Sequence, residues 1–135
     1  MLKLVADANC EGHLTALVNL ARRSEWREVF ELLDVHVYRF ADFGLAGNSI
    51  DRVVWNTVQF HDALLITDNR NMEDADSLQA TINDSNTLSS LPVITFSDIQ
   101  RFKKDREYAA KTLDKLMDYL VDLIDYRGSG RLFIP

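Results

Sequence analysis

The sequence predicts an α/β fold with three layers, in which helices cover both faces of a mostly parallel sheet of four or five strands. Short apolar runs with the character of buried strands alternate four times with segments whose apolar residues recur at helical spacing. The length of 135 residues and a composition of 47% hydrophobic and 27% charged residues are typical of one globular domain. We therefore expect residues 1–135 to form a single domain, extended at its C-terminal end by a long helix and a tail over about 98–135.

The expected strands are short and rich in aliphatic or β-branched residues. They cover residues 2–6, 35–40, 63–67 and 92–96. Helical spacing of apolar residues follows each strand. The expected helices lie around 14–21, over about 24–33, from Asn48 as N-cap through Val58, over about 75–82, and over about 98–126 after a capping box of Ser97 and Gln100.

The tail over 127–135 ends in an apolar run that would be unusual in water. It can fold back on the domain as an edge strand, with Pro135 stopping further pairing. It can equally dock on a partner subunit. The sequence leaves both alternatives open.

Charge and hydropathy argue against several classes of protein. The chain has 15 Lys and Arg against 21 Asp and Glu, which gives a net charge of −6. A module that holds nucleic acid by charge alone needs a basic face, so a contact with nucleic acid here needs a local basic patch or a bound cation. No apolar run approaches the roughly 20 residues that span a bilayer, and the first residues do not resemble a signal peptide. With a single cysteine, we expect a cytoplasmic protein without a membrane partner.

Acidic residues follow the expected strands. Asp7, Asp42, Asp68 and Asp98 lie at or just beyond the four strand ends, and Asp51 lies in the first turn of the helix after Asn48. Ligands of open α/β sheets bind at the edge formed by the carboxyl ends of the strands. Carboxylates that meet there repel one another unless protons or a cation neutralise them, and oxygen ligands without a His or Cys cluster favour Mg²⁺ or Mn²⁺. Such a cation can bind a phosphate oxygen and lower the pKa of a bound water, which is the chemistry of a nuclease.

Each acid also has a purely structural interpretation. Aspartates at strand ends form turns, and aspartates in a first helical turn interact favourably with the helix dipole. The structural interpretation is the favoured one for three of the acids: Asp74, Asp76 and Asp98. A functional role is favoured for Asp7, because it leaves a buried strand directly. For Asp42 and Asp51 both interpretations remain open.

Three segments together resemble the PIN-like domains over about residues 2–98. Asp7-Ala8-Asn9 is similar to the Asp-x-Asn that follows the first strand of those domains. Segment 40–51 (FADFGLAGNSID) is similar to their Asp-Φ-Gly-Leu segment followed by an acid that opens a helix. Segment 64–71 (LLITDNRN) is similar to their strand ending in Thr-x-Asp or Thr-x-Asn.

The resemblance implies a ribonuclease that uses Mg²⁺ or Mn²⁺, as in the toxins of many bacterial toxin–antitoxin pairs, and that hydrolyses RNA phosphodiester bonds through its acidic cluster. It implies catalytic and metal-binding roles for Asp7, Asp42 and Asp51. The remaining expected site residues are Asp68 and Asn69 as further metal ligands, and Asn9, Thr67 and Arg70 as substrate contacts.

The chain departs from the family's pattern after the third strand. Asn69 and Asn71 stand where family members have acids, Met72 replaces an aromatic residue, and Asp68 is displaced by one position. An asparagine can bind a metal through its carbonyl but brings no charge. The alternative is therefore a PIN-like domain with weakened catalysis that acts as a protein-interaction or regulatory module. The expected partners are RNA, an antitoxin or another protein, and a second copy of the chain.

A receiver-type phosphoacceptor also places an aspartate at a strand end. It needs paired acids after the first strand and a lysine after a late strand, and segments 7–9 and 95–97 supply neither. This third hypothesis is the least favoured.

Overall fold

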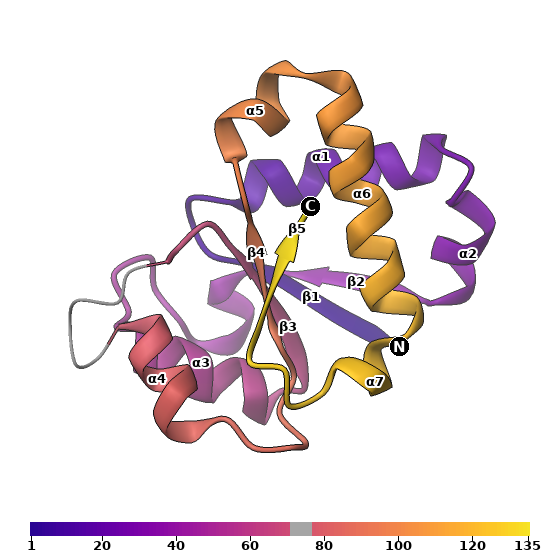
Figure 1. Cartoon of the computed structure of the whole chain (residues 1–135). Helices are drawn as coiled ribbons and strands as arrows, with labels where there is room; N and C mark the ends of the chain where they lie inside the picture. The colour runs from indigo at the N-terminus through magenta and orange to yellow at the C-terminus, as the bar shows by residue number, and fades with distance from the viewer. Residues whose placement is uncertain (71–76) are drawn as a thin grey trace.

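Five parallel strands form one sheet through the middle of the molecule (Figure 1). The computed structural model describes residues 1–70 and 77–135. The strands are β1 (Leu2–Ala6), β2 (Val35–Tyr38), β3 (Ala63–Thr67), β4 (Val93–Phe96) and β5 (Arg131–Ile134). Their order across the sheet is β2-β1-β3-β4-β5. The predicted parallel sheet is therefore confirmed, with β5 as its fifth strand.

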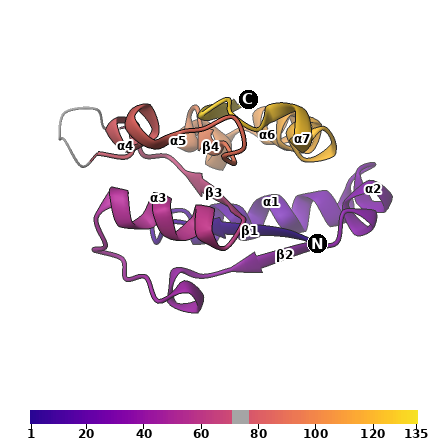
Figure 2. The same cartoon turned by 90° about the horizontal axis from the view of Figure 1, so that it is seen from below.

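Helices cover both faces of this sheet. The elements are α1 (Glu11–Arg23), α2 (Arg27–Leu32), the 3-10 helix η1 (Phe40–Phe43), α3 (Asp51–Phe60), α4 (Leu78–Ser85), α5 (Ile99–Lys104), α6 (Arg106–Val121) and α7 (Leu123–Tyr126). Figure 2 shows α3 and α4 on one side of the sheet and α1, α6 and α7 on the other. The predicted three-layer α/β/α architecture is confirmed. Among the residues described, no helix combines the length and the apolar character needed to cross a membrane.

Each face of the sheet has its own apolar core. Successive side chains of a strand point to opposite faces. In β1, Leu4 and Ala6 accordingly belong to the cluster under α1 and α6, whereas Val5 belongs to the cluster under α3 and α4. The central strand β3 is buried along its whole length, because helices cover it on both sides.

The chain continues from β1 to α1 and from β3 to α4, and these two helices lie on opposite faces of the sheet (Figure 2). The two strands are neighbours, with Ala6 paired to Ile66. A crevice opens where neighbouring loops diverge in this way, and open α/β sheets bind their ligands there.

The C-terminal helical segment is divided, whereas the sequence predicts one helix over about 98–126. Asp98 is the N-cap of α5, and its Oδ1 accepts the backbone N–H of Arg101 at 3.0 Å. The structural role predicted for Asp98 is observed, but Asp98 itself, and not Ser97, caps the helix. Asp105 then ends α5 and caps α6 by accepting the N–H of Tyr108 at 3.1 Å. An aspartate with non-helical backbone angles separates the two helices, within a run of five charged residues over 103–107.

Two other helix starts differ from the sequence prediction. Helix α3 begins at Asp51, after Ile50, so the N-cap predicted at Asn48 is wrong. The helix predicted over 75–82 appears as α4, which begins after Ser77 and continues to Ser85. The hydroxyl of Ser77 accepts the N–H of Ala80 at 3.1 Å and caps this helix. The positions singled out at Asn71, Met72, Asp74 and Asp76 lie outside the described residues.

The C-terminal tail folds back on the domain as edge strand β5. Its neighbour is β4, with Ile134 paired to Phe96. The Ser97 hydroxyl donates to the carbonyl of Pro135 at 2.8 Å, and the Tyr119 hydroxyl donates to the carbonyl of Phe133 at 3.0 Å. Of the two alternatives for the tail, the edge strand is the one observed.

Candidate functional site

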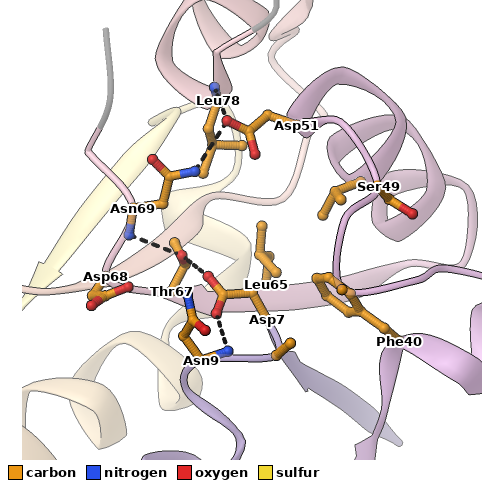
Figure 3. A pocket seen from close by; sticks show the side chains of 13 residues that line it. Asp7, Asn9, Phe40, Ser49, Asp51, Leu65, Thr67, Asp68, Asn69 and Leu78 are labelled. Carbon is orange, nitrogen blue, oxygen red and sulfur yellow. Dashed lines mark hydrogen bonds between the residues drawn. The ribbon is translucent and has the colours of Figure 1, made fainter.

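A polar pocket of about 330 Å³ opens at the carboxyl edge of the sheet, between the ends of β1 and β3 (Figure 3). The first residues of α3 and α4 line its other side. The polar side chains around it are Asp7, Asn9, Ser49, Asp51, Thr67, Asp68 and Asn69. Phe40, Val54, Leu65 and Leu78 supply its apolar surface. The pocket thus occupies the crevice where the two loops diverge.

Asp7 follows β1 directly, and two neighbours hold its carboxylate. Its Oδ1 accepts the backbone N–H of Asn9 at 3.0 Å, and its Oδ2 accepts the hydroxyl of Thr67. Burial raises the pKa of the Asp7 carboxyl, the hydrogen bonds from Thr67 and Asn9 oppose this, and the charge of Asp68 adds to it. Asp7 therefore forms the turn and lines the pocket at the same time.

Asp51 joins the end of β3 to the start of α4. It is the first residue of α3, and its Oδ2 accepts two hydrogen bonds. One comes from Nδ2 of Asn69 at 3.1 Å, and the other comes from the backbone N–H of Leu78, the first residue of α4, at 3.0 Å. Two helix N-termini therefore favour its negative charge. Its Oδ1 has no hydrogen-bond partner within the described part of the chain.

Asp68 and Cys10 lie close to Asp7. One potential ligand atom from each of the three residues lies within 4.8 Å of the other two. Asp68 is exposed, whereas Cys10 is fully buried and its Sγ donates to Oδ1 of Asp68 at 3.6 Å. Burial raises the pKa of the Cys10 thiol, and the neighbouring charges of Asp7 and Asp68 raise it further. The thiol therefore stays protonated at neutral pH, and the carboxylate oxygens are the ligands that this group offers.

The acids around the pocket have no cationic partner in the parts of the chain that the structure describes, 1–70 and 77–135. The salt bridges found there join other pairs of residues. Several carboxylate oxygens that make no direct ion pair suit a hard divalent ion such as Mg²⁺ or Mn²⁺. Asp51 does not belong to the close group of Asp7, Cys10 and Asp68. An ion shared by Asp7, Asp68 and Asp51 would therefore keep bridging waters, as Mg²⁺ usually does.

Asp42 does not line the pocket, although the sequence predicts it as a ligand beside Asp7 and Asp51. It is exposed and lies in η1, where its Oδ2 accepts the backbone N–H of Arg39 at 2.8 Å. The segment after β2 first makes this 3-10 turn, and only Phe40 at its start and later residues such as Ser49 reach the pocket. Asp42 thus makes a local turn contact outside the pocket, and we leave it out of the candidate ligand set.

The three residues predicted to contact substrate occupy different positions. Asn9 is exposed and lines the pocket. Thr67 is buried, and its hydroxyl donates to Asp7 while it accepts the backbone N–H of Asn69 at 3.0 Å, so it positions its neighbours. Arg70 is exposed and does not line the pocket. Of the three, Asn9 is the side chain best placed to touch a ligand.

Sequence reasoning missed Arg131, which reaches the loop beside the pocket from β5. Its Nη1 donates to the backbone carbonyl of Asn69 at 2.7 Å. The available signal was one arginine at the start of an otherwise apolar run, Leu132 to Ile134. That signal could not be interpreted without knowing that the tail becomes a strand beside β4.

The resemblance to PIN-like domains rests on three sequence segments, and the pocket draws residues from all of them, Asp7, Asp51 and Asn69 among others. The fold and the geometry of the pocket are properties of this chain and do not depend on that resemblance. In comparisons with known proteins, the chain matches no family model, and no curated protein or solved structure matches it significantly.

Proposed function

We propose that the chain is a Mg²⁺- or Mn²⁺-dependent ribonuclease with a PIN-like domain, which hydrolyses RNA phosphodiester bonds at the pocket between β1 and β3. The observation that supports this most is the meeting of Asp7, Asp51 and Asp68 at one pocket without a basic partner among the described residues. Carboxylates that meet in this way repel one another, and a bound cation relieves that repulsion. In a protein with a net charge of −6 and no lysine or arginine among the described residues that line the pocket, such a cation would also favour the binding of a phosphate.

The proposed metal ligands are Asp7, Asp68, Asp51 and the side-chain carbonyl of Asn69. When bound, a divalent ion supplies charge stabilisation on a phosphate oxygen and an acidic water. Thr67 and Asn9 fix the carboxylate of Asp7, so this ligand is positioned before the ion arrives. Because the pKa of Asp7 is raised, binding of the cation releases a proton from any protonated fraction, and affinity rises with pH through that range.

The chain's own residues also offer contacts for an anionic substrate. Asn9 is exposed at the rim, where its side-chain amide can donate to a phosphate oxygen. The first turn of α3 lies at the pocket, and backbone N–H groups at a helix N-terminus favour an anion. These groups can orient a phosphodiester without a positively charged side chain in the pocket.

One observation favours the second candidate function, a regulatory or protein-interaction module without catalysis. The amide of Asn69 donates to Asp51 and so stabilises that carboxylate without a metal. A neutral residue at this position also lowers the total charge that would attract a second ion. In this alternative, an antitoxin or another protein would recognise the fold, and the pocket would bind no divalent ion.

The test is cleavage of a labelled, mixed-sequence single-stranded RNA by the purified chain with Mn²⁺ and with EDTA. We expect cleavage with Mn²⁺ alone, and a decrease of about 100-fold in Asp7→Asn, because that change removes a ligand of the ion. Asp114→Asn is the matched control. Asp114 is an exposed residue of α6, and its carboxylate accepts the indole N–H of Trp26 at 2.8 Å. The control variant therefore makes the same charge change away from the pocket.

Equal cleavage by the wild type and Asp7→Asn would contradict the ribonuclease proposal. Titration calorimetry with Mn²⁺ then separates the two candidate functions. An interaction module would show neither heat of Mn²⁺ binding nor a change in unfolding temperature with the metal.

A further inference from the structure

Arg131 is the most highly connected side chain near the pocket that the proposed chemistry does not use. Its Nη1 donates to the carbonyl of Asn69 at 2.7 Å and to the hydroxyl of Thr95 at 2.6 Å. Its Nε donates to Oε1 of Gln79 at 2.8 Å. The guanidinium of Arg131 is therefore hydrogen-bonded to the segment after β3, to β4 and to α4.

The direction of these bonds follows from the register of the sheet. Arg131 pairs with Val93, so its side chain lies on the face covered by α3 and α4. From the first residue of β5 it extends along that face as far as Thr95, which pairs with Thr67 at the end of β3. The planar guanidinium can meet acceptors in several directions at once, and a lysine ammonium on a flexible stem cannot hold the same set.

Asn69 connects this guanidinium to the acids. Its backbone N–H donates to Thr67, whose hydroxyl donates to Asp7. Its side-chain Nδ2 donates to Oδ2 of Asp51 at 3.1 Å. Asn69 is therefore hydrogen-bonded to Asp51 directly and to Asp7 through Thr67. A bond that holds its carbonyl in place also restrains both of these contacts.

The charge of Arg131 is held close to the site. The guanidinium is half-buried, and burial lowers its pKa, with nearby Arg70 acting in the same direction and Asp51 opposing it. An arginine nevertheless remains protonated at neutral pH. Asp51 thus lies within electrostatic reach of a fixed positive charge with which it makes no direct ion pair.

We propose that Arg131 is a positioning residue of the pocket, which holds Asn69 so that Asp51 and Asp7 are set at the distance and orientation a divalent ion needs. The inference rests on the proposed function, and it makes the C-terminal strand part of the site. Groups that orient metal ligands typically change metal affinity or activity by about 10- to 100-fold when they are removed.

The test compares Arg131→Gln with Arg127→Gln in Mn²⁺ titrations by calorimetry. Arg127 belongs to the same tail and also makes two side-chain bonds, to the carbonyl of Ser89 at 2.7 Å and to Asp62 at 3.1 Å. Asp62 precedes β3, at the opposite edge of the sheet from the pocket. Arg127→Gln therefore controls for the removal of a tail arginine without a change near Asn69.

We expect Arg131→Gln to raise the Kd for Mn²⁺ about 10-fold, and Arg127→Gln to leave it within about twofold of the wild type. A rise of less than about threefold in folded Arg131→Gln overturns the proposal. If Arg131→Gln does not fold, Arg131→Lys serves in its place, because it keeps the charge and the stem but loses the forked geometry. Wild-type affinity in Arg131→Lys would show that charge alone matters, and it would also overturn the proposal.

A second measurement separates this proposal from the proposed function. The side-chain amide of Asn69 and the backbone N–H of Leu78 both donate to Asp51, so their NMR resonances report its position without any metal. We expect both resonances to move in Arg131→Gln and neither to move in Arg127→Gln. If the wild type binds no Mn²⁺ but these resonances move, the ribonuclease proposal fails and the positioning role stands. If they do not move, the positioning role fails on its own.

Discussion

The two faces of the sheet differ most near the ends of β3 and β4. On the face covered by α1 and α6, Ile66, Ile94 and Phe96 are fully buried among apolar side chains. On the face covered by α3 and α4, the late positions of the same strands are Thr67 and Thr95, which are buried just as completely. Near these strand ends the sheet therefore carries apolar side chains on one face and two buried threonines on the other, although each face has its own apolar core.

Both buried threonines on the polar face are hydrogen-bonded to residues near the pocket. Thr67 donates to Asp7, and Thr95 accepts from Arg131. A buried donor or acceptor without a partner costs about 1–3 kcal/mol, so this layer is stable only because the site and the C-terminal strand complete it. The comparison teaches that the late positions of β3 and β4 contribute apolar packing on one face, while on the other face they also hold residues of the pocket.

The largest effect is expected on the apolar face. Phe96→Ala should lower the free energy of unfolding by about 3–5 kcal/mol, because it removes a buried ring that packs against Phe102 at 5.3 Å between ring centroids. Urea unfolding followed by circular dichroism measures this change. The Mn²⁺ affinity of the folded variant should stay near that of the wild type. A large loss of affinity with little loss of stability would contradict the division between the faces.

The next effect comes from the metal. Mn²⁺ at about 100 times its Kd should stabilise the wild type by about 2.7 kcal/mol, because it binds only the folded chain. Thermal unfolding with and without Mn²⁺ measures this gain. Asp7→Asn should lose most of it, whereas Phe96→Ala should keep it. An equal gain in Asp7→Asn would show that the ion binds elsewhere.

Two buried threonines allow the faces to be compared directly. Thr95→Val should cost about 1 kcal/mol, because Nη1 of the half-buried Arg131 guanidinium loses one of its two acceptors. Thr112→Val, on the other face, should cost less, since the Thr112 hydroxyl donates to the carbonyl of Tyr108 in its own helix and its loss leaves no buried donor unpaired. Chemical denaturation of both variants measures the two losses of unfolding free energy. Equal costs would remove the distinction between the faces.

The variant Asp42→Asn tests whether Asp42 acts only in the turn η1 or also as a ligand in the pocket. The variant should lose about 0.5 kcal/mol, because the carboxylate of Asp42 accepts the exposed N–H of Arg39. The Mn²⁺ affinity measured by calorimetry should stay within about twofold of the wild type, because Asp42 does not line the pocket. A loss of affinity comparable to that of Asp7→Asn would return Asp42 to the ligand set.

The smallest effect is the pH dependence of Asp7 in the absence of metal. Because burial raises its pKa above 3.8, the folded protein holds this proton more tightly than the unfolded chain. Stability therefore falls as the pH rises from 3.8 through the folded pKa, and above that pKa the cost is constant. Asp7→Asn should be slightly more stable than the wild type at neutral pH, and the difference should shrink toward acidic pH. Urea unfolding in EDTA across this range tests the sign.

The fold was largely predictable from the sequence. Alternating apolar periods indicated strands and helices, because each of these patterns depends on a few neighbouring residues. The break at Asp105 was not predicted, because the charged run over 103–107 is equally typical of the solvated face of one continuous helix. The start of α3 was misplaced for a related reason. Asn48 has the chemistry of an N-cap, but the helix begins after Ile50 without a side-chain cap.

The candidate site was predictable only in part. Asp7 and Asp68 line one pocket, as the strand-end rule suggested, together with Asp51 from the first turn of a helix and Asn69, while Asp42 accepts a hydrogen bond in a turn outside it. The rule identifies which residues lie at the carboxyl edge, but it does not determine which way the following loop turns. That direction depends on how η1 and the segment up to α3 pack over β1 and β3.

The sequence by itself determined the layered α/β architecture and placed an acid after each of the central strands β1 and β3, since both follow from local periodicity and local order along the chain. Only the tertiary structure decided which acids share a pocket and brought Arg131 to Asn69, 62 positions earlier in the chain. The physical reason is that strand order and crossover direction depend on how the whole chain buries its apolar surface. A contact between distant segments exists only once that packing is complete.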